Sequence, residues 1–105
     1  MASELLTKRL KFTRLLCDLI QWANSQPGHA VAIGVDGLKH MANSLHYSGL
    51  ANDLALYVDG EYQTDTVAYK ALGEYWEALD PECRWGGRFK KADGNHFSIT
   101  YQGRA

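Results

Sequence analysis

Apolar residues recur three or four positions apart through the first part of the chain, which is the spacing of one helix face. The residues in this pattern are Leu5, Leu6, Phe12, Leu15, Leu16, Leu19, Ile20 and Ala23. Ser3 stands where an N-cap residue is expected, and Gln26-Pro27-Gly28 is a strong stop signal. The pattern therefore predicts a long helix over residues 3–25.

The later apolar residues fall mostly in short runs bounded by turn signals, which is typical of strands. Residues 30–33 and 50–58 are two such runs, and the Asp-Gly pair at 59–60 favours a tight turn between strands. Residues 85–87 and 97–101 are expected to form the last strands.

Residues 64–79 have the spacing of a second helix, which Thr64 or Asp65 can cap and Asp80-Pro81 ends. Its apolar face is predicted to contain Val67, Ala71, Leu72, Tyr75 and Leu79. A long N-terminal helix, a small largely antiparallel sheet and a second helix against that sheet make an α+β fold. With 105 residues and no internal repeat or linker, the chain is expected to form one domain over residues 1–105.

Composition narrows the class of function. The formal net charge is −1, which gives no electrostatic attraction to duplex nucleic acid, and the three tryptophans are too dispersed for a base-stacking platform. No segment approaches the roughly 18 apolar residues that span a bilayer, and the N-terminus does not resemble a signal peptide. We therefore expect synthesis in the cytoplasm, with no nucleic-acid partner and no membrane insertion.

The two cysteines are too few for a disulfide framework. Cys17 is expected on the apolar side of the first helix, where a free thiol packs as a small hydrophobe. Cys83 follows Pro81 and is expected in a loop.

The chemistry of the chain centres on Asp53, which lies within the mostly apolar run 50–58. A carboxylate there needs a strong partner, because burying an unpaired charge is costly. The candidates are His46, seven residues upstream across the bend that Gly49 allows, and the distant His96. Two imidazoles and a carboxylate make a three-ligand zinc site with a fourth position for water. Each residue alone also has an ordinary structural interpretation, and His40 as a fourth ligand would close the site.

Two linked motifs carry a family resemblance. Ser44-x-His46-x-x-Gly49-x-Ala51-x-Asp53, followed by Asp93-x-x-His96, resembles the zinc peptidases of the D-Ala-D-Ala carboxypeptidase and VanY/VanX group. The short phage endolysins that cleave L-alanyl-D-glutamate bonds are especially similar. The similarity runs from about residue 28 to 101 and includes Tyr75-Trp76 and the segment Trp85-Gly86-Gly87-Arg88-Phe89.

The resemblance implies a D-Ala-D-Ala peptidase/Hedgehog-like fold holding one zinc ion. It assigns His46, Asp53 and His96 as zinc ligands, Asp93 as the catalytic carboxylate and Ser44 to the substrate groove. The implied substrate is the peptidoglycan stem peptide, cut at an amide bond, with L-alanyl-D-glutamate favoured over D-Ala-D-Ala. As a phage lysis enzyme with antimicrobial action, it would reach the cell wall from the host cytoplasm through a holin.

One departure from the family bears on substrate binding. Its members usually carry an arginine before the first zinc ligand, whereas residues 15–83 here contain none. Lys39 or His40 could supply positive charge, but a lysine cannot reproduce a planar two-pronged contact. A non-catalytic relative that keeps zinc, or binds wall peptide without cutting it, is therefore the rival hypothesis. The presence of Asp93 argues against it.

Overall fold

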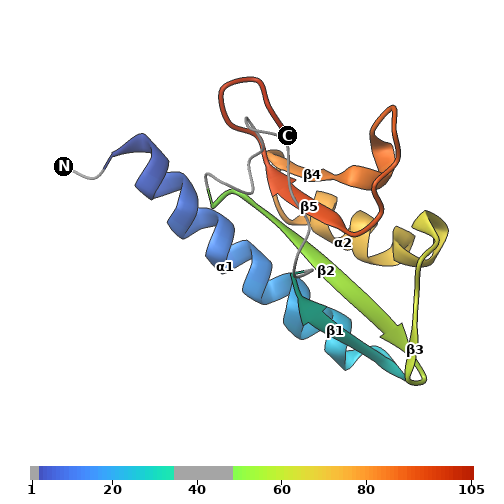
Figure 1. Ribbon diagram of the computed structural model, residues 1–105. Coiled ribbons are helices and arrows are strands. Elements are labelled where there is room, and N and C mark those ends of the chain that lie inside the picture. The colour runs from blue at the N-terminus through green and yellow to red at the C-terminus, as the bar shows by residue number, and fades with distance from the viewer. Residues whose placement is uncertain (1–2, 35–48) are drawn as a thin grey trace.

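The computed structural model describes residues 3–34 and 49–105. Within these ranges the chain forms two α-helices, α1 (Glu4–Ser25) and α2 (Lys70–Leu79), and two short 3-10 segments, η1 (Thr66–Tyr69) and η2 (Gly86–Arg88). The strands are β1 (His29–Ile33), β2 (Ala51–Val58), β3 (Glu61–Tyr62), β4 (Cys83–Trp85) and β5 (His96–Ile99). The predicted α+β class is confirmed (Figure 1).

All strand pairs are antiparallel, and the spatial order is β1-β2-β5-β4. The short β3 pairs with the end of β2 through Tyr57 and Tyr62. Asp59 and Gly60, between these strands, have φ values of 51° and 81°. Two consecutive positive φ values are the signature of a type I′ turn, so the predicted hairpin turn is confirmed.

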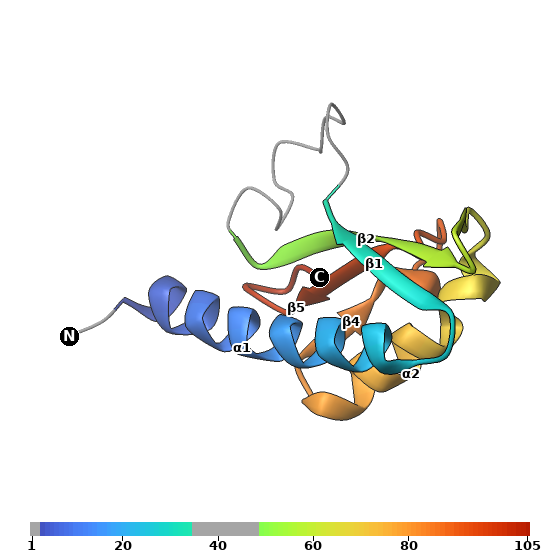
Figure 2. The same ribbon diagram turned by 90° about the horizontal axis from the view of Figure 1, so that it is seen from below.

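Both helices cover the same face of the sheet (Figure 2). The core between them is built from buried residues of every layer: Phe12, Leu16, Leu19, Leu54, Leu56, Leu72, Trp76, Phe97 and Ile99. The Trp76 indole N–H donates to the carbonyl oxygens of Arg84 and Ser98, each at 3.0 Å. This indole therefore joins α2 to β4 and β5 from inside the core.

The first helix follows the prediction closely. Ser3 is its N-cap, and the side chain of Ser3 accepts a hydrogen bond of 3.0 Å from the backbone N–H of Leu6. Cys17, however, is exposed rather than on the apolar side. The buried positions Phe12, Leu16 and Leu19 define a stripe that is too narrow to include it.

The predicted apolar face of the second helix is confirmed in part. Leu72 is buried, and Tyr75 and Leu79 are partly buried against the core, as predicted. Val67, however, is 75% exposed and Ala71 is also exposed, whereas Tyr69 and Trp76 are buried. The reason is the 3-10 segment η1, which has about 3.0 residues per turn instead of 3.6 and so rotates the buried face.

The last two strands also have different bounds from those predicted. The strand expected over 85–87 ends at Trp85, because the backbone turns into η2 at Gly86. Cys83 lies in β4 rather than in a loop and is buried. Burial raises the pKa of its thiol to about 12, so Cys83 stays neutral at ordinary pH.

Candidate metal centre

Asp53 and His96 face each other across the β2–β5 ladder. The Leu54 N–H donates to Asn95 O at 2.9 Å next to this pair, and the Ile99 N–H donates to Leu50 O at 3.1 Å further along the same ladder. This spacing makes Asp53–His96 a non-hydrogen-bonded pair, the type in which opposite side chains approach most closely. The Asp53 Oδ1 and His96 Nδ1 atoms are 4.0 Å apart.

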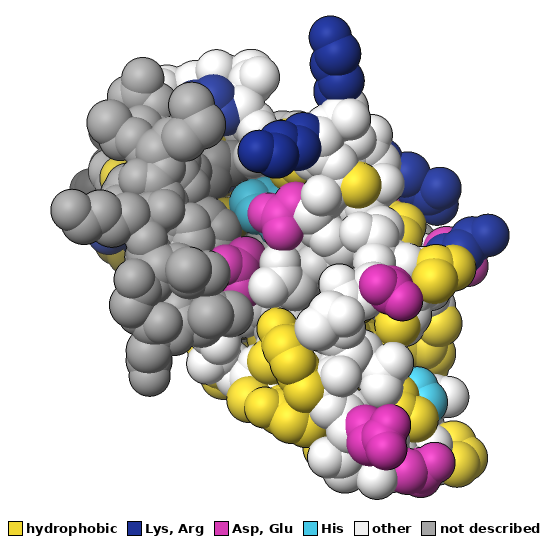
Figure 3. All heavy atoms as spheres, turned by 45° about the vertical axis from the view of Figure 1, so that its right-hand side comes forward, with side chains coloured by type: hydrophobic (Ala, Val, Ile, Leu, Met, Phe, Trp, Pro, Cys, Tyr) yellow, Lys and Arg dark blue, Asp and Glu magenta, His cyan; other side chains and the backbone are white. Residues whose placement is uncertain are grey.

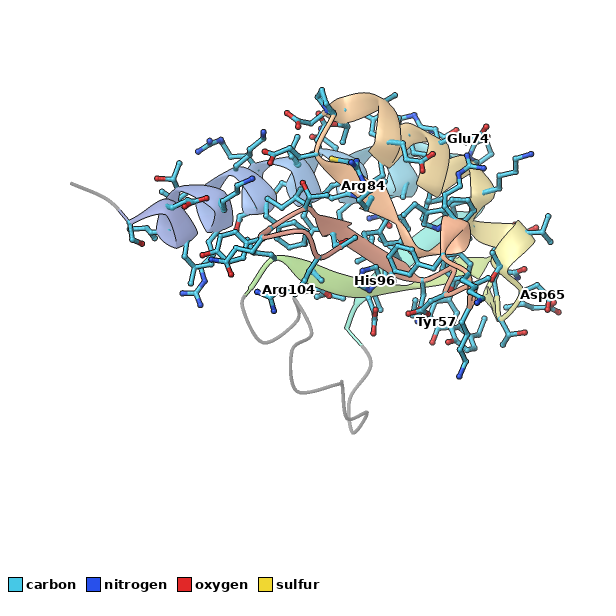
Figure 4. All side chains as sticks on the ribbon, turned by 90° about the horizontal axis from the view of Figure 1, so that it is seen from above. Tyr57, Asp65, Glu74, Arg84, His96 and Arg104 are labelled. Carbon is cyan, nitrogen blue, oxygen red and sulfur yellow. The ribbon has the colours of Figure 1, made fainter. Side chains whose placement is uncertain are left out.

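Both side chains of this pair are almost fully buried: Asp53 is 7% exposed and His96 is 6% exposed. They belong to the face of the sheet opposite to the helices, since the alternate residues Leu54 and Phe97 point into the core. In Figure 4, His96 and Tyr57 project on this helix-free side. Asp53, Ala55 and Tyr57 share the face, as the sequence predicts.

Asp93 reaches the pair from the turn before β5. Its backbone N–H donates to Gly86 O at 2.9 Å, and its carbonyl oxygen accepts from His96 N–H at 3.1 Å. One ligand atom from each of Asp53, Asp93 and His96 lies within 4.8 Å of the other two. Figure 3 shows acidic side chains beside a histidine on this part of the surface. Asp93 itself is exposed, unlike its two neighbours.

Glycines make this close approach possible. A Cβ atom on Gly86 would lie 2.1 Å from Asp93 O and 2.7 Å from the His96 Cβ. A Cβ on Gly94 would lie 2.7 Å from the Cα of Thr66. All three distances are shorter than real Cβ contacts, so larger residues at Gly86 or Gly94 would displace the turn that carries Asp93.

Trp85 fixes the same turn from the core side. Its indole N–H donates to Gly94 O at 2.7 Å. A Cβ on Gly73 or Gly87 would overlap the indole, at 2.1 and 2.3 Å respectively, so the ring fits closely between α2 and η2. Arg88 lies over the outer face of the ring, 5.3 Å from its centroid. Trp85 is thus a core residue that positions the Asp93 turn.

The donor set fits a zinc ion. Ligands at about 2.0–2.2 Å in tetrahedral geometry are separated from one another by roughly 3.4 Å. The 4.0 Å between Asp53 and His96 is close to that separation and too long for a hydrogen bond between them. Imidazole combined with carboxylate favours zinc over the harder ions Mg²⁺ and Ca²⁺, which prefer oxygen ligands.

The structure therefore brings together three of the predicted site residues, Asp53, Asp93 and His96. The other two, His46 and Ser44, lie outside the described residues, as do His40, Lys39 and most of the loop expected over residues 34–43. The roles assigned to the five site residues, Ser44, His46, Asp53, Asp93 and His96, remain predictions.

A small pocket borders Asp93 and was not predicted. It has a volume of about 250 Å³ and is lined by residues 62–64 and 92–95 together with Thr66 and Tyr69. It lies at the edge of β2, between the part of this strand that pairs with β5 and the part that pairs with β3. There the Tyr69 hydroxyl makes the hydrogen bond that a neighbouring strand would otherwise make. It accepts from Leu56 N–H at 3.0 Å and donates to Gln63 O at 2.9 Å. No sequence pattern marks this pocket, because its two walls meet only in the folded chain.

A buried carboxylate–imidazole pair with an exposed carboxylate beside it is suited to holding a catalytic metal ion. A sequence profile described as D-alanyl-D-alanine carboxypeptidase matches residues 38–99, more than half of the chain. The chain belongs to this family, which consists of zinc-dependent peptidases. No curated protein shows a significant match. Within the described residues, neither helix is both long and apolar enough to cross a bilayer.

Proposed function

We propose that this protein is a zinc-dependent peptidase that hydrolyses an amide bond of the peptidoglycan stem peptide, with L-alanyl-D-glutamate as the bond cut. The main support is the convergence of Asp53, Asp93 and His96 within 4.8 Å in a chain of the D-alanyl-D-alanine carboxypeptidase family. His46 would complete a three-ligand set with Asp53 and His96. A zinc ion bound there would supply an activated water and polarise the scissile carbonyl.

The difference in exposure divides the roles of the two aspartates. Asp53 is buried beside His96 and suits a permanent ligand, whereas Asp93 is exposed and can reach both solvent and substrate. Asp93 takes one proton from the attacking water and delivers it to the leaving nitrogen. The acyl carbon gains the hydroxyl group, the C–N bond breaks, and the nitrogen leaves as a free amine.

The relation to short phage endolysins belongs to the same proposal. Under this proposal the enzyme is in the host cytoplasm after synthesis and acts at the cell wall during lysis, which it reaches through a holin. Ser44 would line the substrate groove. D-Ala-D-Ala carboxypeptidase activity, which the family description names, is the alternative reaction. A zinc-containing relative that binds wall peptide without cutting it is the alternative of another class.

Muropeptide analysis tests the proposal directly. Purified zinc-loaded protein is incubated with peptidoglycan, and the products are identified by mass spectrometry with and without a chelator. Chelator-sensitive products carrying a new amino terminus on D-glutamate are expected. Release of D-alanine would establish the alternative reaction instead.

Two substitutions separate a peptidase from a binding module. Asp93→Asn should lower turnover by about 10²-fold or more while zinc remains bound, because it removes the proton carrier and keeps its shape. Asp59→Asn is the matched control, since Asp59 is an exposed turn residue and asparagine tolerates its positive φ. Wild-type protein that binds wall peptide and releases no product would contradict the proposal.

A further inference from the structure

Two exposed tyrosines lie on the sheet beyond the metal-binding cluster. Tyr57 of β2 and Tyr62 of β3 are register partners, and their ring centroids are 5.4 Å apart. Their exposed fractions, 37% and 49%, leave ring surface for a ligand. Tyr57 shares the helix-free face of β2 with Asp53 and comes four positions later, which is a separation of about 13 Å along a strand. Figure 4 shows Tyr57 and His96 projecting on this same side.

The pocket beside Asp93 joins these tyrosines to the cluster, because Tyr62 and Asp93 both line it. Apart from Asp93, which belongs to the cluster, the described residues that line the pocket are neutral. Most of them carry a hydroxyl or amide group, including Gln63, Thr64 and Asn95. At about 250 Å³ the pocket is smaller than the roughly 300–1,000 Å³ of drug-sized ligand sites, so it suits one small ring. An aromatic ring beside neutral hydrogen-bonding groups matches a sugar, which has apolar C–H faces and hydroxyl groups around its edge.

The length of the link between peptide and glycan decides whether a sugar can reach this surface. An extended chain spans at most about 3.6 Å per residue. For the bond of the proposed function, L-alanine and the lactyl group of muramic acid separate the scissile carbonyl from the sugar ring, which is about two residues or roughly 7 Å. The ring would then lie between the cluster and Tyr57. For a bond at the D-alanyl end of the stem, the link is about five residues or roughly 18 Å, which carries the sugar past Tyr57.

We propose that Tyr57, Tyr62 and the pocket beside Asp93 form a subsite for the muramic acid ring of the substrate. The proposal rests on the proposed function and adds that the enzyme recognises the glycan as well as the peptide. The acyl side of the scissile bond then points along β2 towards β3, and the leaving D-glutamate points away from it. The stem peptide has only open-chain residues, so the sugar is the group of the substrate whose ring can pack on the tyrosines.

A matched pair of substrates tests the sugar contact. N-acetylmuramoyl-L-alanyl-γ-D-glutamyl-L-lysine and D-lactoyl-L-alanyl-γ-D-glutamyl-L-lysine have the same link and the same scissile bond, and they differ in the sugar. The zinc-loaded protein should cleave the muramoyl tripeptide with a kcat/KM at least about tenfold higher. A tenfold ratio is about 1.4 kcal/mol, which corresponds to burying roughly 60 Å² of apolar surface. Equal kcat/KM values would overturn the subsite and leave the proposed function standing.

Binding of the acyl product gives a readout that does not require turnover. In the presence of zinc, N-acetylmuramoyl-L-alanine should bind the full chain at least about tenfold more tightly than D-lactoyl-L-alanine in an NMR chemical-shift titration. If neither tripeptide is cut, the proposed function fails, but this affinity ratio still decides whether the subsite exists. Equal affinities would overturn it.

Substitutions at Tyr62 test the contribution of its ring. Tyr62→Leu should lower the muramoyl-to-lactoyl ratio, in cleavage and in binding, by about fivefold or more, because it removes an exposed ring that lines the pocket. Tyr62→Phe keeps the ring and should keep most of the ratio. Leu10→Ala is the control, since it removes an exposed apolar side chain from α1, outside the pocket. An unchanged ratio in Tyr62→Leu, or an equal fall in Leu10→Ala, would contradict the subsite.

Discussion

Single residues without side chains set the geometry of the candidate centre. Gly86 allows the Asp93 carbonyl and the His96 Cβ to lie within 2.1 and 2.7 Å of where its own Cβ would be. Backbone on one side and a strand residue on the other leave no flexible group that can move aside. Metal binding should therefore be more sensitive to Gly86 than to substitutions at exposed polar positions.

We expect Gly86→Ala to lower zinc affinity by tenfold or more and to destabilise the fold by about 1–3 kcal/mol, since the added methyl group displaces the Asp93 turn. Competition with a chromophoric chelator measures the affinity, and urea unfolding measures the stability. Gly60→Ala is the control: its φ of 81° costs stability, but the space around it is open. Wild-type zinc affinity in the Gly86 variant would refute this account of the turn.

At the scale of elements, ion pairs attach α1 to the segment leading into β4. Lys8 and Lys11 both contact Glu82, the latter at 2.7 Å, and Lys11 also contacts Asp80 at 3.1 Å. Hydrogen bonds from Lys11 and Lys8 lower the pKa of the Glu82 carboxyl to about 2. The pKa of Asp80 is also lowered, first by the backbone N–H of Glu82 and then by Lys11.

These shifts predict a pH dependence of stability. A carboxyl with a lowered folded-state pKa stabilises the fold above its ordinary pKa of 4.5, and this contribution is lost as the pH falls towards 2. The Glu82→Gln variant should lose less free energy of unfolding than the wild type as the pH falls. The difference should be about 1 kcal/mol or less, because the ion pairs of Glu82 are partly exposed. Urea unfolding of chelator-treated protein between pH 5.5 and pH 2.5 measures it, with exposed Glu61→Gln as the control. Identical pH profiles of stability for wild type and Glu82→Gln would show that the ion pairs of Glu82 do not cause this pH dependence.

Local sequence signals predicted the elements whose structure is set locally. Ser3, Pro27 and the Asp-Gly turn gave correct ends for α1 and β2, and the period-2 pattern placed Asp53 on a face that His96 could reach. The first turn of the second helix was mispredicted, because residues 66–69 form a 3-10 segment that depends on the tertiary bonds of Tyr69. The pocket could not be predicted, since residues 62–64 and 92–95 are neighbours only across the sheet.

For the whole molecule, metal binding and folding should be coupled, because two of the clustered groups come from different strands. Zinc at 100 times its Kd should stabilise the wild-type protein by about 2.7 kcal/mol and raise Tm on the order of 10 °C. Asp53→Asn should lose most of this increase. Differential scanning fluorimetry measures both, with calcium as the control ion. Equal zinc-dependent increases in the two proteins would show that the metal binds elsewhere.

Because Asp53 and His96 come from neighbouring strands, metal binding by this pair also reports whether β2 and β5 are correctly aligned. Sliding β5 by one position against β2 would carry the imidazole to the opposite side of the sheet. Cobalt(II), whose visible absorption reports its coordination, could then distinguish correctly aligned molecules from misaligned ones in a library of β5 insertions. An optical assay of sheet assembly would thus be available without any substrate.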